Sequence, residues 1–286
     1  MTRKNKKHDY AAFILTHRRP DRVWTYEALR KHGYTGPIYL LVDDTDPTID
    51  EYKERYGDEV IVFPKKEAYN ITDTMDNNPK MNVVVFARNY IYKVVEQLGY
   101  KKFLELDDDY IRFSLAFLRF GEKKEIPIRN LDKVFEIVWN YMDKTPFKTL
   151  AFAQGGDFIG GGKQQVKKGF KRKAMNLFFC RTDRPLEFKG RLNEDVNMYV
   201  LEGLRGGLVG TITHLKLQQM LTQHNAGGLT DAYLDVGTYV KSFYSVMISP
   251  AAVKITVLKQ KNWRIHHKVR WEHTAVKIIP EKYKRR

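Results

Sequence analysis

"KKFLELDDDYIRFS", residues 101–114, places three consecutive aspartates directly after an apolar segment. The segment "KKFLELDDD" reads as a buried β-strand that ends in charge. Neighbouring like charges repel, so the cluster Asp107–Asp109 is unfavourable unless water or a cation offsets it. The stretch therefore predicts a strand whose carboxyl end holds a charged ligand.

The sequence around this stretch alternates between strand and helix patterns. Because such alternation is typical of βαβ units, we expect a mostly parallel, Rossmann-like sheet flanked by helices. The predicted bounds are a basic arm at 1–9, one α/β domain at 10–250 and a basic extension at 251–286. The strands are expected at 11–17, 37–44, 59–64, 101–109, 174–181 and 208–219, with a further strand that runs into a glycine-rich loop over 149–162. The helices are expected at 21–33, 83–98, 130–144, 193–207 and 231–249.

Composition favours a folded intracellular protein. Hydrophobic residues make up 43% of the 286 residues and aromatic residues 13%, enough to form a sizeable core. The single cysteine, Cys180, excludes an internal disulfide and fits a reducing compartment. No apolar run approaches the ~18 residues of a membrane span. We expect a cytoplasmic protein, or one in the host cytoplasm if a phage encodes it.

The positive charge is large and clustered. The formal net charge is +16, a balance that attracts polyanions such as nucleic acid. Residues 163–173 carry six basic residues and no acid, and residues 259–286 carry ten basic residues against two acids. Solvated loops with generic solubility charge are the alternative. Because both clusters lie beside glycines and aromatics, we favour a phosphate-binding surface.

Polar residues follow three of the expected strands: Thr16-His17-Arg18, Asp43-Asp44 and the three aspartates. Ligands of open α/β sheets bind outside the carboxyl ends of the strands, so this pattern predicts a nucleotide site. The chain lacks both GxxxxGK[ST] and a GxGxxG after its first strand. A divalent cation held by carboxylates would neutralise the phosphates instead, and oxygen ligands suit Mg²⁺ or Mn²⁺. The alternative for the three aspartates is an acidic turn that caps the segment from Tyr110.

Two segments carry a resemblance to a known family. "AFILTHRRPDRVWTYEALRKHGYTGPIYLLVDDTD" (12–46) and "ARNYIYKVVEQLGYKKFLELDDDY" (87–110) resemble TET-associated glycosyltransferases, a GT-A-type group of phages and eukaryotes related to the base J glucosyltransferase. The resemblance covers roughly residues 10–250. It implies a GT-A fold, a UDP-sugar donor, Mn²⁺ or Mg²⁺, and a hydroxymethylated pyrimidine in DNA as acceptor.

The resemblance also implies roles on the donor side. Thr16 and Arg18 would approach the uridine, and Asp43 or Asp44 would bind the uracil or ribose. Asp109 and Asp107 would hold the metal and diphosphate, with His224 as a third metal ligand or diphosphate contact; a loop histidine without function is the alternative. The expected donor-binding residues are Thr16, Arg18, Asp43, Asp44, Arg88, Asp107, Asp108, Gly155, Gly156 and Asp157. For Arg88, a surface helix charge is the alternative.

Acceptor activation requires a general base. "RLNEDVNMY" (191–199) offers Asp195, our first choice, and Glu194, the second, after an Asn193 cap. GT-A inverting enzymes carry such a pair at this point, so the resemblance implies inversion. The alternative is that acids in the first turn of a helix merely favour its dipole.

DNA as acceptor would explain the charge, because a duplex base must flip out or the duplex distort to reach such a pocket. Two other hypotheses stay open: a GT-A transferase acting on a protein, glycan or small molecule, and a non-catalytic DNA-binding relative. The expected DNA contacts are Lys163, Lys167, Lys168, Lys171, Arg172, Lys173, Arg264, His267 and Arg270, with Trp263 and Trp271 stacking on exposed bases.

Overall fold

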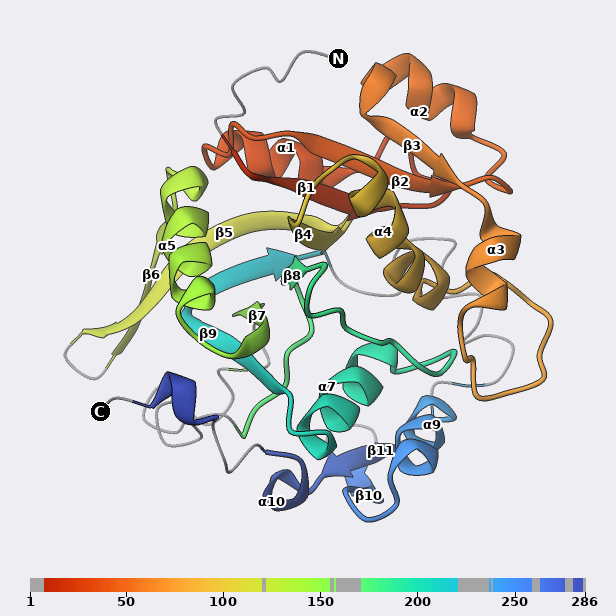
Figure 1. Cartoon of the computed structure of the whole chain (residues 1–286), viewed down its shortest axis with the longest axis vertical. Helices are drawn as coiled ribbons and strands as arrows, with labels where there is room; N and C mark the ends of the chain where they lie inside the picture. The colour runs from red at the N-terminus through yellow and green to blue at the C-terminus, as the bar shows by residue number, and fades with distance from the viewer. Residues whose placement is uncertain are drawn as a thin grey trace.

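The computed structural model describes residues 8–119, 122–154, 157, 171–220, 237, 239–258, 263–275 and 280–284. Its first sheet has the strand order β3-β2-β1-β4-β8 (Figure 1). The four strands β1 to β4 run parallel, and β8 joins β4 antiparallel. The bounds are β1 Tyr10–Leu15, β2 Ile38–Asp43, β3 Val60–Phe63, β4 Lys102–Asp107 and β8 Phe178–Arg181.

Both faces of this sheet are buried, which explains why its strands are continuous apolar runs. Alternate residues of β1 enter two different core clusters: Phe13 packs on one face and Ile14 on the other. Helix α4 (Val85–Gln97) covers the first face, while α1 (Trp24–Lys31) and α5 (Leu131–Asp143) cover the second. The short helices α2 (Ile49–Tyr56) and α3 (Lys65–Asn70) flank β3 in the chain.

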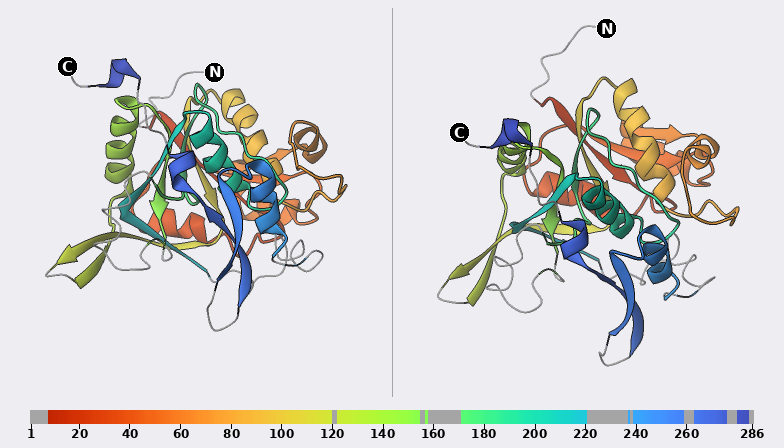
Figure 2. Two further views of the ribbon diagram at one scale, coloured as in Figure 1. Left: turned by 90° about the horizontal axis from the view of Figure 1, so that it is seen from below. Right: turned by 60° about the horizontal axis from the view of Figure 1, so that its bottom comes forward.

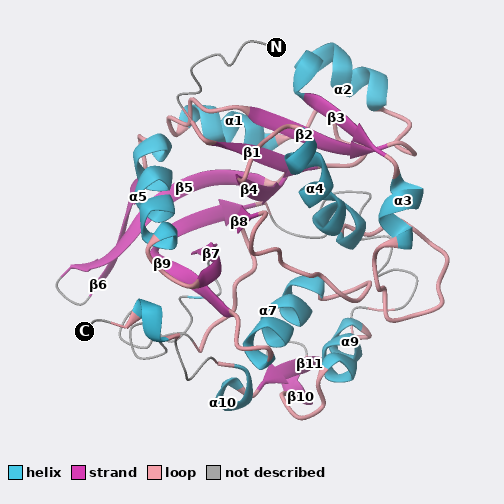
Figure 3. Cartoon of the chain, viewed as in Figure 1, coloured by secondary structure: helices cyan, strands magenta, loops and turns pink. Residues whose placement is uncertain are grey.

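A second sheet has the order β6-β5-β9-β7 (Figure 3). Its strands are β5 Tyr110–Arg119, β6 Glu122–Pro127, β7 Phe147–Ala153 and β9 Leu208–Gln219. Strand β9 pairs antiparallel with β5 and parallel with β7. Because β5 begins directly after the three aspartates, the acidic turn is the point where the chain passes from the first sheet to the second.

The C-terminal part packs on helix α7 (Glu194–Leu204). It consists of α9 (Lys241–Ile248), the hairpin β10 (Val253–Leu258) and β11 (Arg264–Val269), and α10 (Trp271–Thr274). The short 3-10 helices are η1 (Gly57–Glu59) and η3 (Glu281–Tyr283). Ala252 and Val253 are fully buried in the first core cluster, so this part of the extension is docked rather than hanging free.

The α/β class predicted from the sequence is confirmed, with two differences. The expected single sheet is two sheets and a separate hairpin in the described part of the chain. Strands β5 and β6 escaped prediction because the aspartates disguise the start of β5 and charged residues fill β6. Cys180 is a buried free thiol, as expected. In the described ranges, no helix has the length and apolar character to cross a membrane.

Candidate functional site

The acidic turn is fixed by a threonine of helix α1. Thr25 is fully buried, and its Oγ1 donates to the Asp107 carbonyl at 2.6 Å. The same oxygen accepts from the Tyr110 backbone N–H at 2.9 Å, and the Thr25 backbone N–H donates to the Asp108 carbonyl at 3.1 Å. These bonds hold both ends of the turn, so the three carboxylates project from a rigid backbone.

Arg88 joins this turn to the predicted catalytic helix. The side chain of Arg88 is buried, and its three nitrogens contact three carboxylates. The Glu105 contact is 2.5 Å long, the Asp107 contact 2.8 Å and the Glu194 contact 3.2 Å. One guanidinium therefore ties the middle of β4, its carboxyl end and the first residue of α7 together. Arg88 was expected to contact the donor, but in the structure its guanidinium contacts carboxylates of the protein itself.

Carboxylates outnumber cationic side chains around the acidic turn and the start of α7, and several of these carboxyls have raised pKa values. Burial, and then the charges of Asp107 and Asp108, raise the pKa of Asp109 to about 7. Burial and the neighbouring Asp195 raise the pKa of Glu194 to about 7 against the opposing charge of Arg88. Burial also raises the pKa of Asp195. Such perturbed carboxyls are typical of functional sites.

Asp109 differs from Asp107 in its partners. Asp107 receives Arg88 on one oxygen and the Tyr110 hydroxyl on the other, at 2.8 and 3.3 Å. The Oδ1 atom of Asp109 is buried without a hydrogen-bond partner. A buried carboxylate oxygen without a hydrogen bond destabilises the folded protein by about 1–3 kcal/mol or more. Asp109 is therefore the carboxylate of the turn that an external ligand would stabilise.

The ends of β1 and β2 form a second cluster, which is balanced in charge. His17 Nδ1 lies 2.8 Å from the Asp43 carboxylate, and Lys65 Nζ lies 3.1 Å from the same group. Burial alone would raise the pKa of Asp43, but hydrogen bonds from His17 and Thr45 and the charge of Lys65 lower it below its usual range. Asp44 is exposed, and its Oδ1 accepts from the Lys65 backbone N–H at 3.0 Å.

Thr16 and the residues after it link this cluster to the acidic turn. The Thr16 hydroxyl donates to Asp108 at 2.8 Å and lies 2.7 Å from the Tyr52 hydroxyl. Arg18 has a left-handed φ of +56°, and its backbone N–H donates to Asp46 at 2.6 Å, which leaves its side chain exposed. Five predicted donor residues (Thr16, Arg18, Asp43, Asp44 and Asp108) thus lie at adjoining strand ends.

Asn193 precedes the predicted bases, although it does not cap the helix with its side chain. Its backbone has a φ of +56°, and its Nδ2 lies 2.9 Å from the Lys241 carbonyl and 3.1 Å from His267 Nδ1. Burial, and then the nearby His266 and Lys241, lower the pKa of His267 to about 4. His267 is therefore neutral at pH 7 and turned inward, which makes it unsuited to pair with a phosphate.

The remaining predicted residues are dispersed. Arg172 is buried, Lys171 is exposed and Lys173 is partly exposed. Arg264 is exposed and Arg270 partly so. Asp157 accepts from the Gln154 backbone N–H at 3.0 Å. Six predicted residues lie outside the described ones: Gly155, Gly156, Lys163, Lys167, Lys168 and His224.

No three His, Cys, Asp or Glu side chains within the described ranges are arranged as a metal site. The residues nevertheless fit a cation that is shared with a ligand. Mg²⁺ is commonly held by one or two carboxylates together with substrate phosphates and water. The unpartnered oxygen of Asp109 supplies such a carboxylate.

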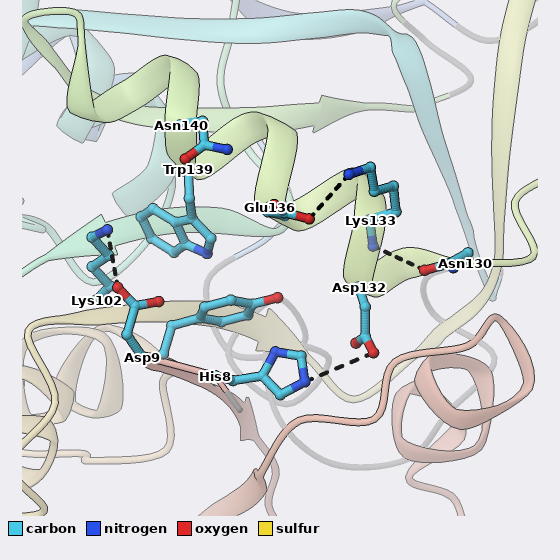
Figure 4. A pocket seen from close by; sticks show the side chains of 10 residues that line it. His8, Asp9, Lys102, Asn130, Asp132, Lys133, Glu136, Trp139 and Asn140 are labelled. Atoms are coloured by element: carbon cyan, nitrogen blue, oxygen red, sulfur yellow. Dashed lines mark hydrogen bonds and ion pairs between the residues drawn. The ribbon is translucent and has the colours of Figure 1, made fainter. Parts of the chain in front are cut away.

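A separate polar cavity of about 480 Å³ lies at the opposite end of the strands (Figure 4). It is lined by Tyr10 and Lys102, which pair at the starts of β1 and β4, and by the beginning of α5. Lys102 pairs with Asp9 at 3.2 Å, and Lys133 pairs with Glu136 at 3.4 Å. Since the cavity lies at the other end of the strands from the acidic turn, it is not the candidate active site.

Comparison with known proteins identifies the family. The model of the TET-associated glycosyltransferases matches residues 10–228, which is more than three quarters of the chain. The chain belongs to the TET-associated glycosyltransferase family. This membership confirms the resemblance seen in the sequence, and with it the expected glycosyltransferase class and GT-A-type α/β architecture. No curated protein matches the chain.

Solved structures show more distant likenesses. Residues 1–349 of Staphylococcus aureus TarS, in complex with UDP-GlcNAc, give a TM-score of 0.43 at 14% identity over 84% of this chain. The chain spans 66% of that fragment, just under two thirds. Glucosyl-3-phosphoglycerate synthase from Mycobacterium tuberculosis, with UDP, gives 0.46 at 8% identity, covering 89% of this chain and 86% of that one.

Sequence reasoning missed three residues that organise the site. Glu105 is fully buried on β4 beside Arg88, and a charged residue inside an apolar strand was the signal. Lys65 is buried against Asp43, but it comes from a helix that was not predicted. Thr25 carried no signal, because a threonine in a helix is ordinary.

Proposed function

We propose that this family member transfers a sugar from a UDP-sugar to the hydroxymethyl group of a modified pyrimidine, 5-hydroxymethylcytosine or 5-hydroxymethyluracil, in DNA. The observation that carries the proposal is the buried Asp109 Oδ1 without a hydrogen-bond partner, in a turn that Asp107 and Arg88 connect to the Glu194–Asp195 pair. A donor-side carboxylate and an acceptor-side base are what sugar transfer to a hydroxyl requires.

On the donor side, the balanced cluster around Asp43 receives the nucleoside. Asp43 or Asp44 would accept hydrogen bonds from the uracil or ribose, and the exposed Arg18 lies at the same strand ends. Asp109, with Asp107 beside it, would hold a divalent cation, which polarises the leaving diphosphate when it is bound. The Asp107 oxygens are oriented by Arg88 and Tyr110, which hold this carboxylate beside Asp109.

On the acceptor side, Asp195 takes the proton from the attacking hydroxyl. Asp195 is partly exposed, whereas Glu194 is buried and bonded to Arg88. Asp195, the less buried of the two residues, would therefore contact the substrate, and Glu194 would position the start of α7. A general base with a raised pKa is a better proton acceptor near neutral pH, because its pKa lies closer to the pH at which the enzyme works. Attack opposite the diphosphate would invert the anomeric centre.

DNA as the acceptor is supported by the net charge of +16 and by the exposed basic residues Lys171 and Arg264. Phosphate contacts of this kind make binding steeply dependent on salt. Arg172 and His267 are not part of this surface, because the first is buried and the second is neutral and turned inward.

The test is transfer from a panel of UDP-sugars to duplexes that contain either modified base, run with Mn²⁺ and read by mass spectrometry of the nucleosides. We expect one sugar mass on the modified base and none on cytosine or thymine. Asp109→Ala should abolish the product, while Asp183→Ala, which removes an exposed carboxylate paired with Arg181, should keep it. Failure to modify any DNA while UDP binds normally would remove DNA as the acceptor and favour a protein, glycan or small molecule.

A further inference from the structure

The hairpin β10–β11 projects from the body of the protein beside helix α7 (Figure 2). Its strands pair antiparallel from Val253↔Val269 at the base to Leu258↔Arg264 toward the tip. A projecting two-stranded ribbon is marginally stable by itself, so its base must be anchored. The role of the hairpin concerns how a DNA acceptor reaches the site, and it therefore rests on the proposed function.

The base of the hairpin is anchored directly on the predicted catalytic helix. Val253 is fully buried, and the Arg270 backbone N–H donates to the Ala252 carbonyl at 2.7 Å. Trp271 stacks on Tyr199 of α7 with ring centroids 5.5 Å apart, so this tryptophan is a packing residue and not a free stacking surface. Helix α10 also approaches α7 so closely that a Cβ on Gly203 would lie 1.6 Å from the Thr274 carbonyl oxygen.

His267 extends this anchoring to the reaction centre. It lies on β11, and its Nδ1 contacts the side chain of Asn193 at 3.1 Å. Asn193 immediately precedes Glu194 and Asp195. Strand β11 therefore contacts the residue that precedes the proposed general base, so a polymeric acceptor bound at that base would lie beside the hairpin.

One face of the hairpin carries five apolar residues together with His267, and its apolar side chains become exposed toward the tip. Val257 and Ile265 are cross-strand partners on the same face as the buried Val253, and they are 48% and 40% exposed. Trp263, the residue before β11, is 70% exposed. Exposed apolar side chains grouped in this way mark an interaction surface.

The opposite face of the hairpin is basic. Lys254 and Lys268 are cross-strand partners there, and Arg264 pairs with Leu258 further along the same face. All three basic side chains are exposed. Residues 251–271 contain six lysines and arginines and no acidic residue, so the partner of this segment carries negative charge.

We propose that the hairpin is a wedge that separates a duplex base pair next to the target base. Lys254, Arg264 and Lys268 contact phosphates, while Trp263, with Ile265 and Val257 behind it, presses between bases. Apolar side chains inserted at a base step unstack it and bend the duplex. The wedge makes the target pyrimidine available to Asp195, which a paired base would not be.

The first experiment compares Trp263→Ala with the wild-type protein on the same modified oligonucleotide, either fully paired or single-stranded. We expect the ratio of kcat/KM on the paired substrate to that on the single strand to fall about tenfold to a hundredfold, a size typical of the loss of one aromatic–base stack. Ile137→Ala, which removes a comparably exposed apolar side chain from α5, should leave this ratio unchanged. An unchanged ratio for Trp263→Ala would overturn the wedge.

A second measurement does not need sugar transfer. A duplex with 2-aminopurine beside the target base should gain fluorescence when the wild-type protein binds, and gain much less with Trp263→Ala. No gain with the wild type overturns the wedge, even if the enzyme glycosylates DNA. Gain without any transfer would instead keep the wedge and reject the proposed DNA reaction. Loss of co-sedimentation with phosphatidylglycerol vesicles in Trp263→Ala, without a duplex effect, would reassign the surface to a membrane.

Discussion

Two groups of carboxylates at neighbouring strand ends behave in opposite ways. Around Asp43, a histidine, a lysine and a threonine hydroxyl offset the charge, and the pKa of Asp43 is lowered. Around Asp109 and Glu194, the guanidinium groups of Arg19 and Arg88 face a larger number of carboxylates, and burial with like-charge repulsion raises both pKa values to about 7. The charges around Asp43 are offset within the protein, whereas those around Asp109 and Glu194 are not fully offset. Under the proposed function, the first group would bind the nucleoside, and the second would be neutralised by a cation and the substrate.

The largest effect is expected when the proposed general base, Asp195, is removed. We expect Asp195→Asn to lower the rate of sugar transfer about 10²–10⁴-fold, because a positioned general base contributes that much. Donor binding, measured by UDP titration calorimetry, should stay the same. Glu194→Gln serves as the paired variant. If it lowers the rate more than Asp195→Asn while both fold normally, Glu194 is the base and Asp195 is the supporting residue.

The next prediction concerns Arg88, which contacts three carboxylates of the group around Asp109 and Glu194. Arg88→Met should reduce the free energy of unfolding by about 3–5 kcal/mol, because it leaves buried carboxylates without their partner. Urea denaturation measures this change. Arg205→Met removes a half-exposed arginine paired with Glu187 and should cost less than about 1 kcal/mol. Similar losses for the two variants would show that the Arg88 cluster is screened by solvent rather than buried.

A smaller effect is expected on stability, and its sign should differ between substitutions at Asp43 and at Asp109. At pH 7, Asp43→Asn should destabilise the protein by about 1–3 kcal/mol, since it removes charge-assisted hydrogen bonds. Asp109→Asn should leave stability unchanged or raise it, since it removes repulsion. Both free energies of unfolding come from urea titrations without divalent cations. Asp109→Asn as the more destabilising of the two would contradict the assignment of Asp109 as the unsatisfied carboxylate.

The pH dependence of stability has its origin in the same shifts. The folded state binds the proton of Asp109 more tightly than the unfolded state, so this carboxyl favours folding below pH 4 and loses that contribution as pH rises to about 7. The lowered pKa of Asp43 works the other way: its contribution is full above pH 4 and disappears as the pH falls. The fall of stability from pH 5 to pH 7 should therefore be smaller in Asp109→Asn than in the wild type.

Much of this could be predicted from sequence. Apolar runs ending in Thr16, Asp43 and Asp107 located the parallel strands and the edge at which they gather polar groups, because the order of strands and crossovers in an α/β sheet is set by local patterns. The Glu194–Asp195 pair at the start of a helix could also be predicted from the sequence. The division into two sheets could not be predicted, because it depends on the direction in which β5 leaves the acidic turn.

The α/β class, the family motifs, the positive charge and the identities of the carboxylates follow from the order of residues alone. Which of these carboxylates find hydrogen-bond partners depends on how the chain packs. Asp107 and Asp109 are the same residue type two positions apart, yet one faces Arg88 from a distant helix and the other has a buried oxygen with no hydrogen-bond partner. In the same way, Trp271 became a packing residue while Trp263 stayed exposed. Burial and long-range pairing set proton affinity and exposure, and neither is encoded in the spacing of residues along the chain.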